Sequence, residues 1–328
     1  MTKTAADIRR LVETSCPNIC QMAIVQRGRT VFSSCWNGYA PTDAAHVMSV
    51  TKSVMALLVG IAIDQQKIGG LDDKIIDYFP DVPLPRGEKT ARLVTLRHLL
   101  SMRAPYKGKG DPWTRVCTAP DWAAASLAFL GGPKGLTDAF DYRTVCLHIL
   151  SGLLARATGM NTVDFANRHL FAPLGIPPRK NFVAADAAEH KRFMLGKGPR
   201  KKLWFADTAG NATPGYGLCI SADDLAKIGR LCLGRGTIDG RKILSAAWFD
   251  EMTRPRHVDA SAFAGLHYGL LWWVVHSEEN IYAAIGHSGN VLYVHPARDL
   301  AIAVTAAFKP TVADRIPFIE SRLLPLVR

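Results

Sequence analysis

The sequence predicts an α+β fold in which an antiparallel sheet, flanked by helices, is built from both ends of the chain, with a mainly helical domain inserted between them. Runs rich in β-branched and aromatic residues lie near both termini of the 328 residues, whereas helical patterns fill the middle. Strands and helices do not alternate as the βα units that build parallel sheets. We therefore expect a discontinuous sheet domain over residues 1–75 and 250–328, and a mainly helical domain over 76–249.

The first 75 residues predict a helix, a hairpin and a buried helix. Residues 4–14 carry apolar side chains at helical spacing. The β-rich runs 22–26 and 30–36 flank a glycine turn, as strands of a hairpin do. Residues 49–66 are apolar nearly all round and end before Gly69-Gly70, which is typical of a buried helix.

The remaining elements follow from periodicity and from turn residues. Helices are predicted over residues 96–102, 121–130, 145–157 and 223–233, with Ser221 capping the last. Strands are predicted over 268–275, 281–287, 291–295 and 300–307, followed by a closing helix over 313–324. Alternation in the first of these strands would point only one of the Trp272 and Trp273 rings inward. The lysine-rich and glycine-rich segments 107–112 and 196–202 are expected to be solvated loops.

Composition indicates a globular chain of ordinary polarity. Hydrophobic residues make up 48% and charged residues 21%, and no uncharged apolar run approaches the roughly 18 residues of a spanning helix. The amino terminus carries charges where a signal peptide is apolar. We therefore expect a cytoplasmic protein with no membrane contact.

The net charge of +12 is the one unusual feature of the composition. It is compatible with nucleic acid, anionic lipid or an acidic substrate, but no recognisable nucleic-acid module accompanies it, so specific nucleic-acid binding is not expected. The seven cysteines are odd in number, and Cys16 and Cys20 are spaced C-x3-C, which argues against a disulfide framework and a zinc ribbon. Nucleotide-binding and zinc-binding motifs are also absent, so we expect no metal and no cofactor.

The segment Gly286-His-Ser-Gly-Asn290 resembles the nucleophile elbow of α/β-hydrolases. An elbow serine needs an acid and then a histidine downstream. After Ser288 the only histidine is His295, and no carboxylate lies between them. A hydrolase triad in that chain order therefore cannot be assembled.

Ser49 and Lys52 form the only S-x-x-K sequence in the chain. A spacing of three residues places both side chains on one face of the predicted buried helix, at its amino end, where free N–H groups favour a developing anion. Burial lowers the pKa of a lysine and favours a neutral amine that can accept the serine proton. The alternative is that Ser49 is an ordinary helix cap and Lys52 a solvated first-turn residue.

Three ordered elements resemble the serine β-lactamase and penicillin-binding-protein superfamily. His46-Val-Met-Ser-Val-Thr-Lys-Ser-Val is similar to its first motif, Phe140-Asp-Tyr-Arg-Thr occupies the place of its tyrosine motif, and His287-Ser288-Gly289 fits its third motif. The resemblance covers about residues 20–310 and is greatest to the class C branch, which includes D-alanyl-D-alanine carboxypeptidases, family VIII esterases and 6-aminohexanoate-dimer hydrolases. It implies an active site at the interface of the two predicted domains.

The resemblance implies a serine acyl-enzyme mechanism. Ser49 would attack a carbonyl, while Lys52 and Tyr142 would share the proton transfers. The backbone N–H groups of Ser49 and Asn290 would form the oxyanion hole. His287 would take the place of the cationic residue of the third motif.

Two departures from the class C pattern favour esters or non-lactam amides over β-lactams as substrates. Thr144 stands where a substrate-contacting asparagine is expected and cannot donate an amide N–H. His287-Ser288 replaces the usual Lys-Thr pair. Three aromatic residues in loops that resemble the rim of the family's cleft are further candidates for substrate contact: Tyr106, Trp113 and Trp204.

The sequence therefore predicts a hydrolase of small esters or amides. The alternatives are a β-lactamase or carboxypeptidase that recognises penicillin, and a non-catalytic member of the fold that binds a ligand or partner. If the basic loops 107–112 and 196–202 line the cleft, the substrate is expected to carry a carboxylate. The sequence leaves the oligomeric state open.

Overall fold

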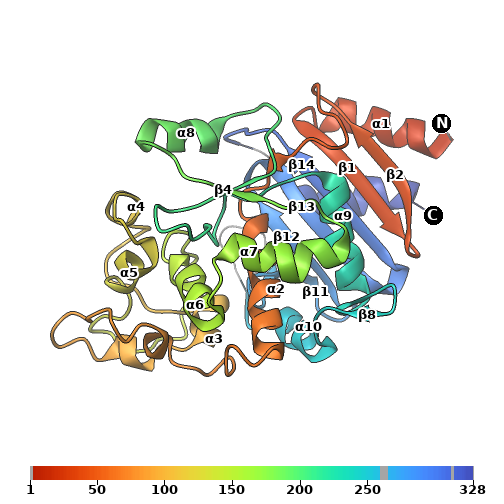
Figure 1. Ribbon diagram of the computed structural model, residues 1–328. Helices are drawn as coiled ribbons and strands as arrows, with labels where there is room; N and C mark the ends of the chain where they lie inside the picture. The colour runs from red at the N-terminus through yellow and green to blue at the C-terminus, as the bar shows by residue number, and fades with distance from the viewer. Residues whose placement is uncertain (1–2, 259–264, 312–313, 328) are drawn as a thin grey trace.

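The computed structural model describes residues 3–258, 265–311 and 314–327. An antiparallel sheet of eight strands, in the order β2-β1-β14-β13-β12-β11-β10-β9, forms its centre (Figure 1). The strands are β1 Ile19–Gln26, β2 Arg29–Cys35, β9 His257–Val258, β10 His267–Tyr268, β11 Trp273–His276, β12 Ile281–Gly286, β13 Asn290–His295 and β14 Leu300–Ala306. Because β1 pairs with β14, the two ends of the chain meet in one sheet. The predicted fold class is confirmed.

The hairpins are set by residues with positive φ. Arg27 and Gly28, with φ of 49° and 72°, connect β1 to β2, as in the turns that match strand twist. Asp299, with φ of 46°, closes the turn between β13 and β14. All residues of β1 and β14 are buried, which indicates that both faces of the sheet are covered.

Helices cover the two faces of the sheet. Tyr282 in β12 donates a hydrogen bond to Cys232 in α9 (Ala222–Leu233), whereas Tyr293 in β13 donates one to Glu320 in the C-terminal helical segment. Tyr293 lies opposite Ala283 in the register and therefore points away from the face that Tyr282 occupies. The buried helix α2 (Val50–Asp64) also packs on β12 and β13.

Helix α9 corrects part of the predicted domain division. It lies within the segment 76–249, which was expected to be the helical domain, but it packs on β1, β13 and β14. Its apolar stripe, with Gly229 in contact with Ala301 and Leu292, brings it onto the sheet. Otherwise the two-domain division remains a prediction.

The segment between α2 and β9 is mainly helical, and α3 to α6 lie together on one side of the molecule (Figure 1). Its helices besides α9 are α3 Leu96–Leu100, α4 Trp113–Cys117, α5 Trp122–Leu127, α6 His148–Thr158, α7 Thr162–Ala166, α8 Ala187–Leu195 and α10 Ala246–Thr253. Short two-stranded pairings join β3 Ala45–His46 to β6 Cys219–Ile220, and β4 Lys180–Phe182 to β5 Leu203–Phe205. Ser221 caps α9 as expected, accepting a hydrogen bond from the Asp224 amide at 3.1 Å.

Two predicted elements differ from the structure. The strand 268–275 is a hairpin of β10 and β11, because the Gly269 amide bonds to the Trp272 carbonyl at 2.9 Å and Leu271 has φ of 57°. This turn buries both Trp272 and Trp273, so the expectation that only one ring points inward is wrong.

The predicted closing helix 313–324 is divided into three helical forms. It comprises α11 (Arg315–Phe318), a π turn over Ile319–Leu323 and a short 3-10 helix over Leu324–Leu326, while Ala313 lies outside the described residues. A helix α1 (Lys3–Ser15) at the other end of the chain contacts this segment.

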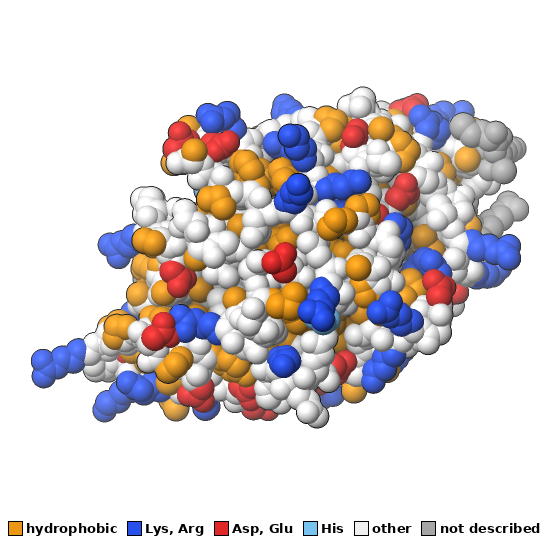
Figure 2. All heavy atoms as spheres, in the orientation of Figure 1, with side chains coloured by type: hydrophobic (Ala, Val, Ile, Leu, Met, Phe, Trp, Pro, Cys, Tyr) orange, Lys and Arg blue, Asp and Glu red, His pale blue; other side chains and the backbone are white. Residues whose placement is uncertain are grey.

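The basic excess does not gather into one stripe on the face that Figure 2 shows. There, lysine and arginine side chains are dispersed among acidic and apolar ones. None of the helices in the described part of the chain has the length and apolarity that crossing a lipid bilayer requires.

Candidate active site

Ser49 lies at the start of α2, between β3 and the helix. It occupies the cap position with helical dihedral angles, φ −71° and ψ −5°, but its side chain makes no capping hydrogen bond. The preceding residue, Met48, is held at φ 52°, a conformation that costs energy for a non-glycine residue and occurs often at functional sites. The Ser49 hydroxyl is therefore not used as an ordinary helix cap.

Lys52 contacts this hydroxyl from inside the protein. Its Nζ donates to Ser49 Oγ at 2.8 Å, to Thr144 Oγ1 at 3.1 Å and to the Gly215 carbonyl at 2.9 Å. The side chain is only 1% exposed, so it is not the solvated residue of the alternative interpretation. Burial lowers the pKa of Lys52 to about 7, against a smaller opposing effect from the charge of Asp111.

Tyr142 lies on the other side of the lysine. The Lys52 ammonium nitrogen lies 4.7 Å from the centroid of its ring, which stacks on Trp273 at 6.0 Å. Burial raises the pKa of Tyr142 to about 12, and a hydrogen bond with Ser49 partly opposes the rise. Ser49, Lys52 and Tyr142, from two separate segments, thus meet at one point.

Asp111 holds the tyrosine-bearing segment in place, a role that the sequence did not reveal. Its carboxylate accepts hydrogen bonds from the amides of Thr144, at 2.8 Å, and Val145, at 3.1 Å. Thr144 in turn presents its hydroxyl to Lys52. The only signal in the sequence is an acidic residue at the end of a lysine and glycine run, in a loop expected to be solvated.

A second backbone segment, around Gly215, is fixed against α2. The His46 Nε2 accepts a hydrogen bond from the Gly217 amide at 3.0 Å, and Thr51 Oγ1 accepts one from Leu218 at 3.3 Å. Burial lowers the pKa of His46 to about 3, so the ring is neutral and can accept this bond at neutral pH. These contacts aim the Gly215 carbonyl at Lys52.

The third motif connects β12 to β13. Ser288 and Gly289 have positive φ, 69° and 87°, and the Ser288 hydroxyl bonds to the backbone of Lys309 rather than standing free. Asn290 is fully buried, with its side chain bonded to the His287 carbonyl and the Ala306 amide. His287 is exposed and stacks on Phe308.

Gly286 brings the end of β12 close to Ser49. A Cβ at this position would lie 2.3 Å from the Val47 carbonyl oxygen and 3.2 Å from the Ser49 nitrogen. Only glycine fits this close approach. The β12 end and the start of α2 are therefore in direct backbone contact, and Ser49 and Asn290 line one cavity.

Ser49 lies where two cavities meet. One, of about 400 Å³, runs along the third motif and is called the strand-side cavity. Its lining includes Tyr142, His287, Ser288, Gly289, Asn290, Thr311, Asp314 and Arg315. The other, of about 450 Å³, is called the apolar cavity and is lined by Met48, Ser49, Trp113, Thr144, Met194, Leu195, Tyr216, His287, Phe308 and Pro310.

Arg315 supplies a buried cation to the strand-side cavity. Its side chain donates to Cys16 Sγ at 2.9 Å and Asn18 Oδ1 at 2.7 Å, and its Nε has no hydrogen-bond partner among the described residues. It forms no ion pair within the described part of the chain. In contrast, no residue of the basic loops 107–112 and 196–202 lines either cavity, so the expectation that these loops line the cleft is not met.

The three aromatic candidates have different positions. Trp113 lines the apolar cavity and is 39% exposed. Trp204 is completely buried in β5, where it bonds to the Thr213 carbonyl, so the expected substrate contact is wrong for this residue. Tyr106 lines a different cavity.

The family model described as Beta-lactamase matches residues 15–321. The chain belongs to the Beta-lactamase family. This result, together with the relatives below, confirms the predicted resemblance to the serine β-lactamase and penicillin-binding-protein superfamily.

Relatives within this fold include hydrolases. A 6-aminohexanoate-dimer hydrolase from Paenarthrobacter ureafaciens is 24% identical over 319 residues, covering 90% of this chain and 74% of the relative. The structure of EstA from Arthrobacter nitroguajacolicus matches with a TM-score of 0.70 at 17% identity, over 98% and 95% of the two chains. A penicillin-binding protein homologue from Caulobacter crescentus matches with a TM-score of 0.68 at 17% identity, over 93% and 92%.

Proposed function

We propose that this protein is a serine hydrolase that cleaves small esters or non-lactam amides through an acyl-enzyme on Ser49. The observation that carries the proposal is the contact of 2.8 Å between a buried Lys52 amine and the Ser49 hydroxyl, at the junction of two cavities. With a pKa of about 7, the lysine is substantially neutral at physiological pH and can act as a base.

Acylation begins when Ser49 Oγ attacks the substrate carbonyl while Lys52 accepts the serine proton. Tyr142, whose pKa is about 12, keeps its proton at neutral pH and donates it to the leaving alcohol or amine. Lys52 then returns the proton to Tyr142, which shares with it a hydrogen bond to the Ser49 side chain. Water then hydrolyses the acyl-enzyme ester on Ser49. The proton transfers run in the reverse order, and the free Ser49 hydroxyl is regenerated.

The tetrahedral intermediate carries a negative oxygen. The amides of Ser49 and Asn290 are assigned as its donors, because the close approach of Gly286 to Ser49 brings the β12 and α2 ends together. Removing one such donor typically slows an enzyme by about 100-fold or more. The amide of Ser49 also lies at the positive end of the α2 dipole.

Side chains around Ser49 favour a carboxylate-bearing ester or linear amide. Thr144 is already engaged with Lys52, and Ser288 with Lys309, so neither offers the contacts of the class C pattern. Arg315 places a buried cation in the strand-side cavity. A 6-aminohexanoate dimer, the compound in one relative's name, is itself a linear amide with a carboxylate.

Labelling with a fluorophosphonate, followed by digestion and mass spectrometry, tests the nucleophile. We expect an adduct on Ser49 that disappears in Ser49→Ala and remains in Ser288→Ala, the matched control in the elbow-like segment. No adduct, or labelling that survives in Ser49→Ala, would overturn the proposal. Faster turnover of a chromogenic cephalosporin than of a short p-nitrophenyl ester would instead favour the β-lactamase alternative.

A further inference from the structure

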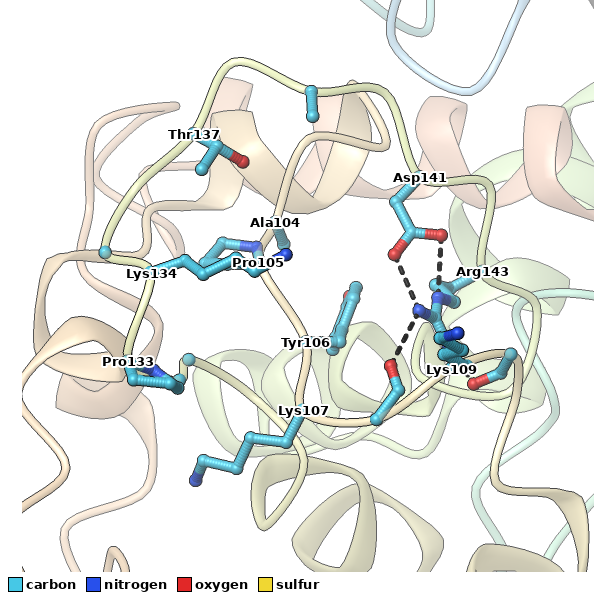
Figure 3. Close-up of a pocket in the computed structure, with 16 residues that line it drawn as sticks. Ala104, Pro105, Tyr106, Lys107, Lys109, Pro133, Lys134, Thr137, Asp141 and Arg143 are labelled. Atoms are coloured by element: carbon cyan, nitrogen blue, oxygen red, sulfur yellow. Dashed lines mark hydrogen bonds and ion pairs between the residues drawn. The ribbon is translucent and has the colours of Figure 1, made fainter.

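A cavity of about 630 Å³ lies apart from the two cavities at Ser49, and none of the described residues lines both it and either of them. Three stretches of chain enclose it: residues 104–110, residues 131–139, and the pair Asp141 and Arg143 (Figure 3). In this view Tyr106 lies between Lys107 and Arg143. The proposed hydrolysis makes no use of this cavity.

Its lining is strongly basic. Four of the described residues that line it are cations, Lys107, Lys109, Lys134 and Arg143, and Asp141 is the only carboxylate among them. Lys107 forms an ion pair at 2.8 Å with Glu88, which is not among the lining residues. Arg143 forms an ion pair at 2.7 Å with Asp141. The exposed ammonium groups of Lys109 and Lys134 have no ion-pair partner among the described residues, so the cavity has an unbalanced positive charge.

The backbone of the cavity is open to a ligand. Gly108, Gly110 and Gly135 have φ of 82°, 68° and 73°, and a Cβ on any of them would meet no atom within 4 Å. Oxygen atoms of a ligand can therefore approach the backbone at Gly108 and Gly110 without a side chain in the way, whereas the Gly135 amide donates to the Gly132 carbonyl at 3.4 Å. Exposed backbone amides in glycine turns, combined with lysines, are typical of phosphate recognition.

The loop that contains Gly108 and Gly110, which lines this cavity, is connected to the candidate active site. Arg143 donates hydrogen bonds to the carbonyls of Gly108 and Gly110, and it lies between Tyr142 and Thr144 in the chain. Asp111, the next residue after Gly110, holds the Thr144 amide. A ligand that joins Lys109 to Lys134 would therefore restrain the loop that positions the tyrosine-bearing segment.

We propose that this cavity binds a small phosphorylated anion through Lys109, Lys134 and the glycine-rich loops, and that its occupancy supports the active-site segment. Binding does not depend on hydrolysis by Ser49 and can be measured in Ser49→Ala. Only the effect on catalysis rests on the proposed function.

Calorimetric titration with inorganic pyrophosphate, at constant ionic strength, tests the site. We expect saturable binding with a stoichiometry of one, weakened at least tenfold in Lys109→Gln/Lys134→Gln. The matched control Lys197→Gln/Lys201→Gln removes the same charge from exposed lysines elsewhere and should bind as the unmodified protein does. Equal weakening in both variants, unchanged affinity in the first variant, or no saturable binding would overturn the site.

The consequence for catalysis is tested separately with a neutral p-nitrophenyl ester. Saturating pyrophosphate should raise kcat/KM at least twofold in the unmodified protein and not in Lys109→Gln/Lys134→Gln, whose melting temperature without ligand should be unchanged. An equal response in both proteins would overturn the link between the cavity and the active site. If the protein hydrolyses no ester, the calorimetric result still decides whether the site exists.

Discussion

The Lys52 side chain is only 1% exposed, and no carboxylate of the described residues contacts it. This environment strongly disfavours the charged form of the lysine. Its three acceptors are two hydroxyls and one carbonyl, which suit an amine in either protonation state. The buried lysine therefore costs folding energy, and in the proposed mechanism it supplies a base near neutral pH.

The pH dependence of ester hydrolysis should reveal the pKa of Lys52. Because the neutral amine is the proposed base, kcat/KM for a neutral ester should rise through a pKa of about 7 and fall tenfold per unit of pH below it. Steady-state rates from pH 5 to 9 measure the profile. Lys52→Arg, which stays protonated, should lose activity by about 100-fold or more at every pH. A rate independent of pH between 5 and 8 would contradict the role.

Arg315 is expected to select for a carboxylate on the substrate. Arg315→Met removes the buried cation of the strand-side cavity, so KM for a carboxylate-bearing ester should rise about tenfold or more, since a hydrogen bond to a charged group contributes about 1.5–3 kcal/mol. The KM for a neutral ester of the same size should change little. Paired kinetic measurements on the two esters, with melting curves to confirm folding, make the comparison. An equal rise for both esters would indicate a structural role only.

At the scale of elements, the loop 107–112 is a structural support of the site rather than a solvated connection. Asp111 ties it to the segment 141–145, and Arg143 ties that segment back to the loop carbonyls. The two segments are 33 residues apart in the chain and act as one unit. Electrostatically, the Asp111 carboxylate raises the pKa of Lys52 against the larger effect of burial.

Asp111→Asn should separate the effect of the Asp111 charge on the pKa of Lys52 from the hydrogen bonds by which Asp111 holds the segment 141–145. Removing the negative charge should move the acid limb of the kcat/KM profile to lower pH, because the charge that stabilises protonated Lys52 is lost. The loss of one amide acceptor should also lower kcat severalfold. The pH profile of the variant, beside that of the exposed control Asp138→Asn, measures both effects. An acid limb that stays in place would contradict the electrostatic contribution of Asp111.

At the scale of the whole molecule, the sheet carries the third motif on one side of the candidate site, and α2 carries Ser49 on the other. Their relative position depends on how closely helices pack on β12 to β14. Gly229 in α9 allows one such contact, since a Cβ there would lie 2.7 Å from Ala301 Cβ and 3.0 Å from Leu292 Cδ1.

Gly229→Ala should therefore destabilise the protein although alanine favours helices. The gain of about 1 kcal/mol in helix propensity is smaller than the 1–3 kcal/mol that overpacking a core usually costs. Urea unfolding should show a net loss of about 1 kcal/mol. The double variant Gly229→Ala/Ala301→Gly, which removes the opposing methyl group, should be more stable than the sum of the single effects predicts. If the effects of the two substitutions on the free energy of unfolding are strictly additive, the side chains at positions 229 and 301 do not clash.

Local features of the sequence were enough to predict the fold class and the contact between Ser49 and Lys52. The strand-like runs at both ends, the apolar helix 49–66 and the spacing of Ser49 and Lys52 are set by short-range periodicity. The sequence therefore indicated an antiparallel sheet from both termini and a serine beside a lysine on one helical face.

Tertiary packing alone decided the environment of that pair. The Gly215 carbonyl, which accepts a hydrogen bond from Lys52, is 163 residues away from Lys52 in the chain. Neither Asp111 nor Arg315 carries a local sequence pattern that distinguishes it from a solvated residue. Trp204, expected in a substrate-facing loop, is instead completely buried. The burial of a side chain and the charges around it depend on many neighbours that only the folded chain brings together. These neighbours, and not the spacing of Ser49 and Lys52, bring the pKa of the lysine to about 7.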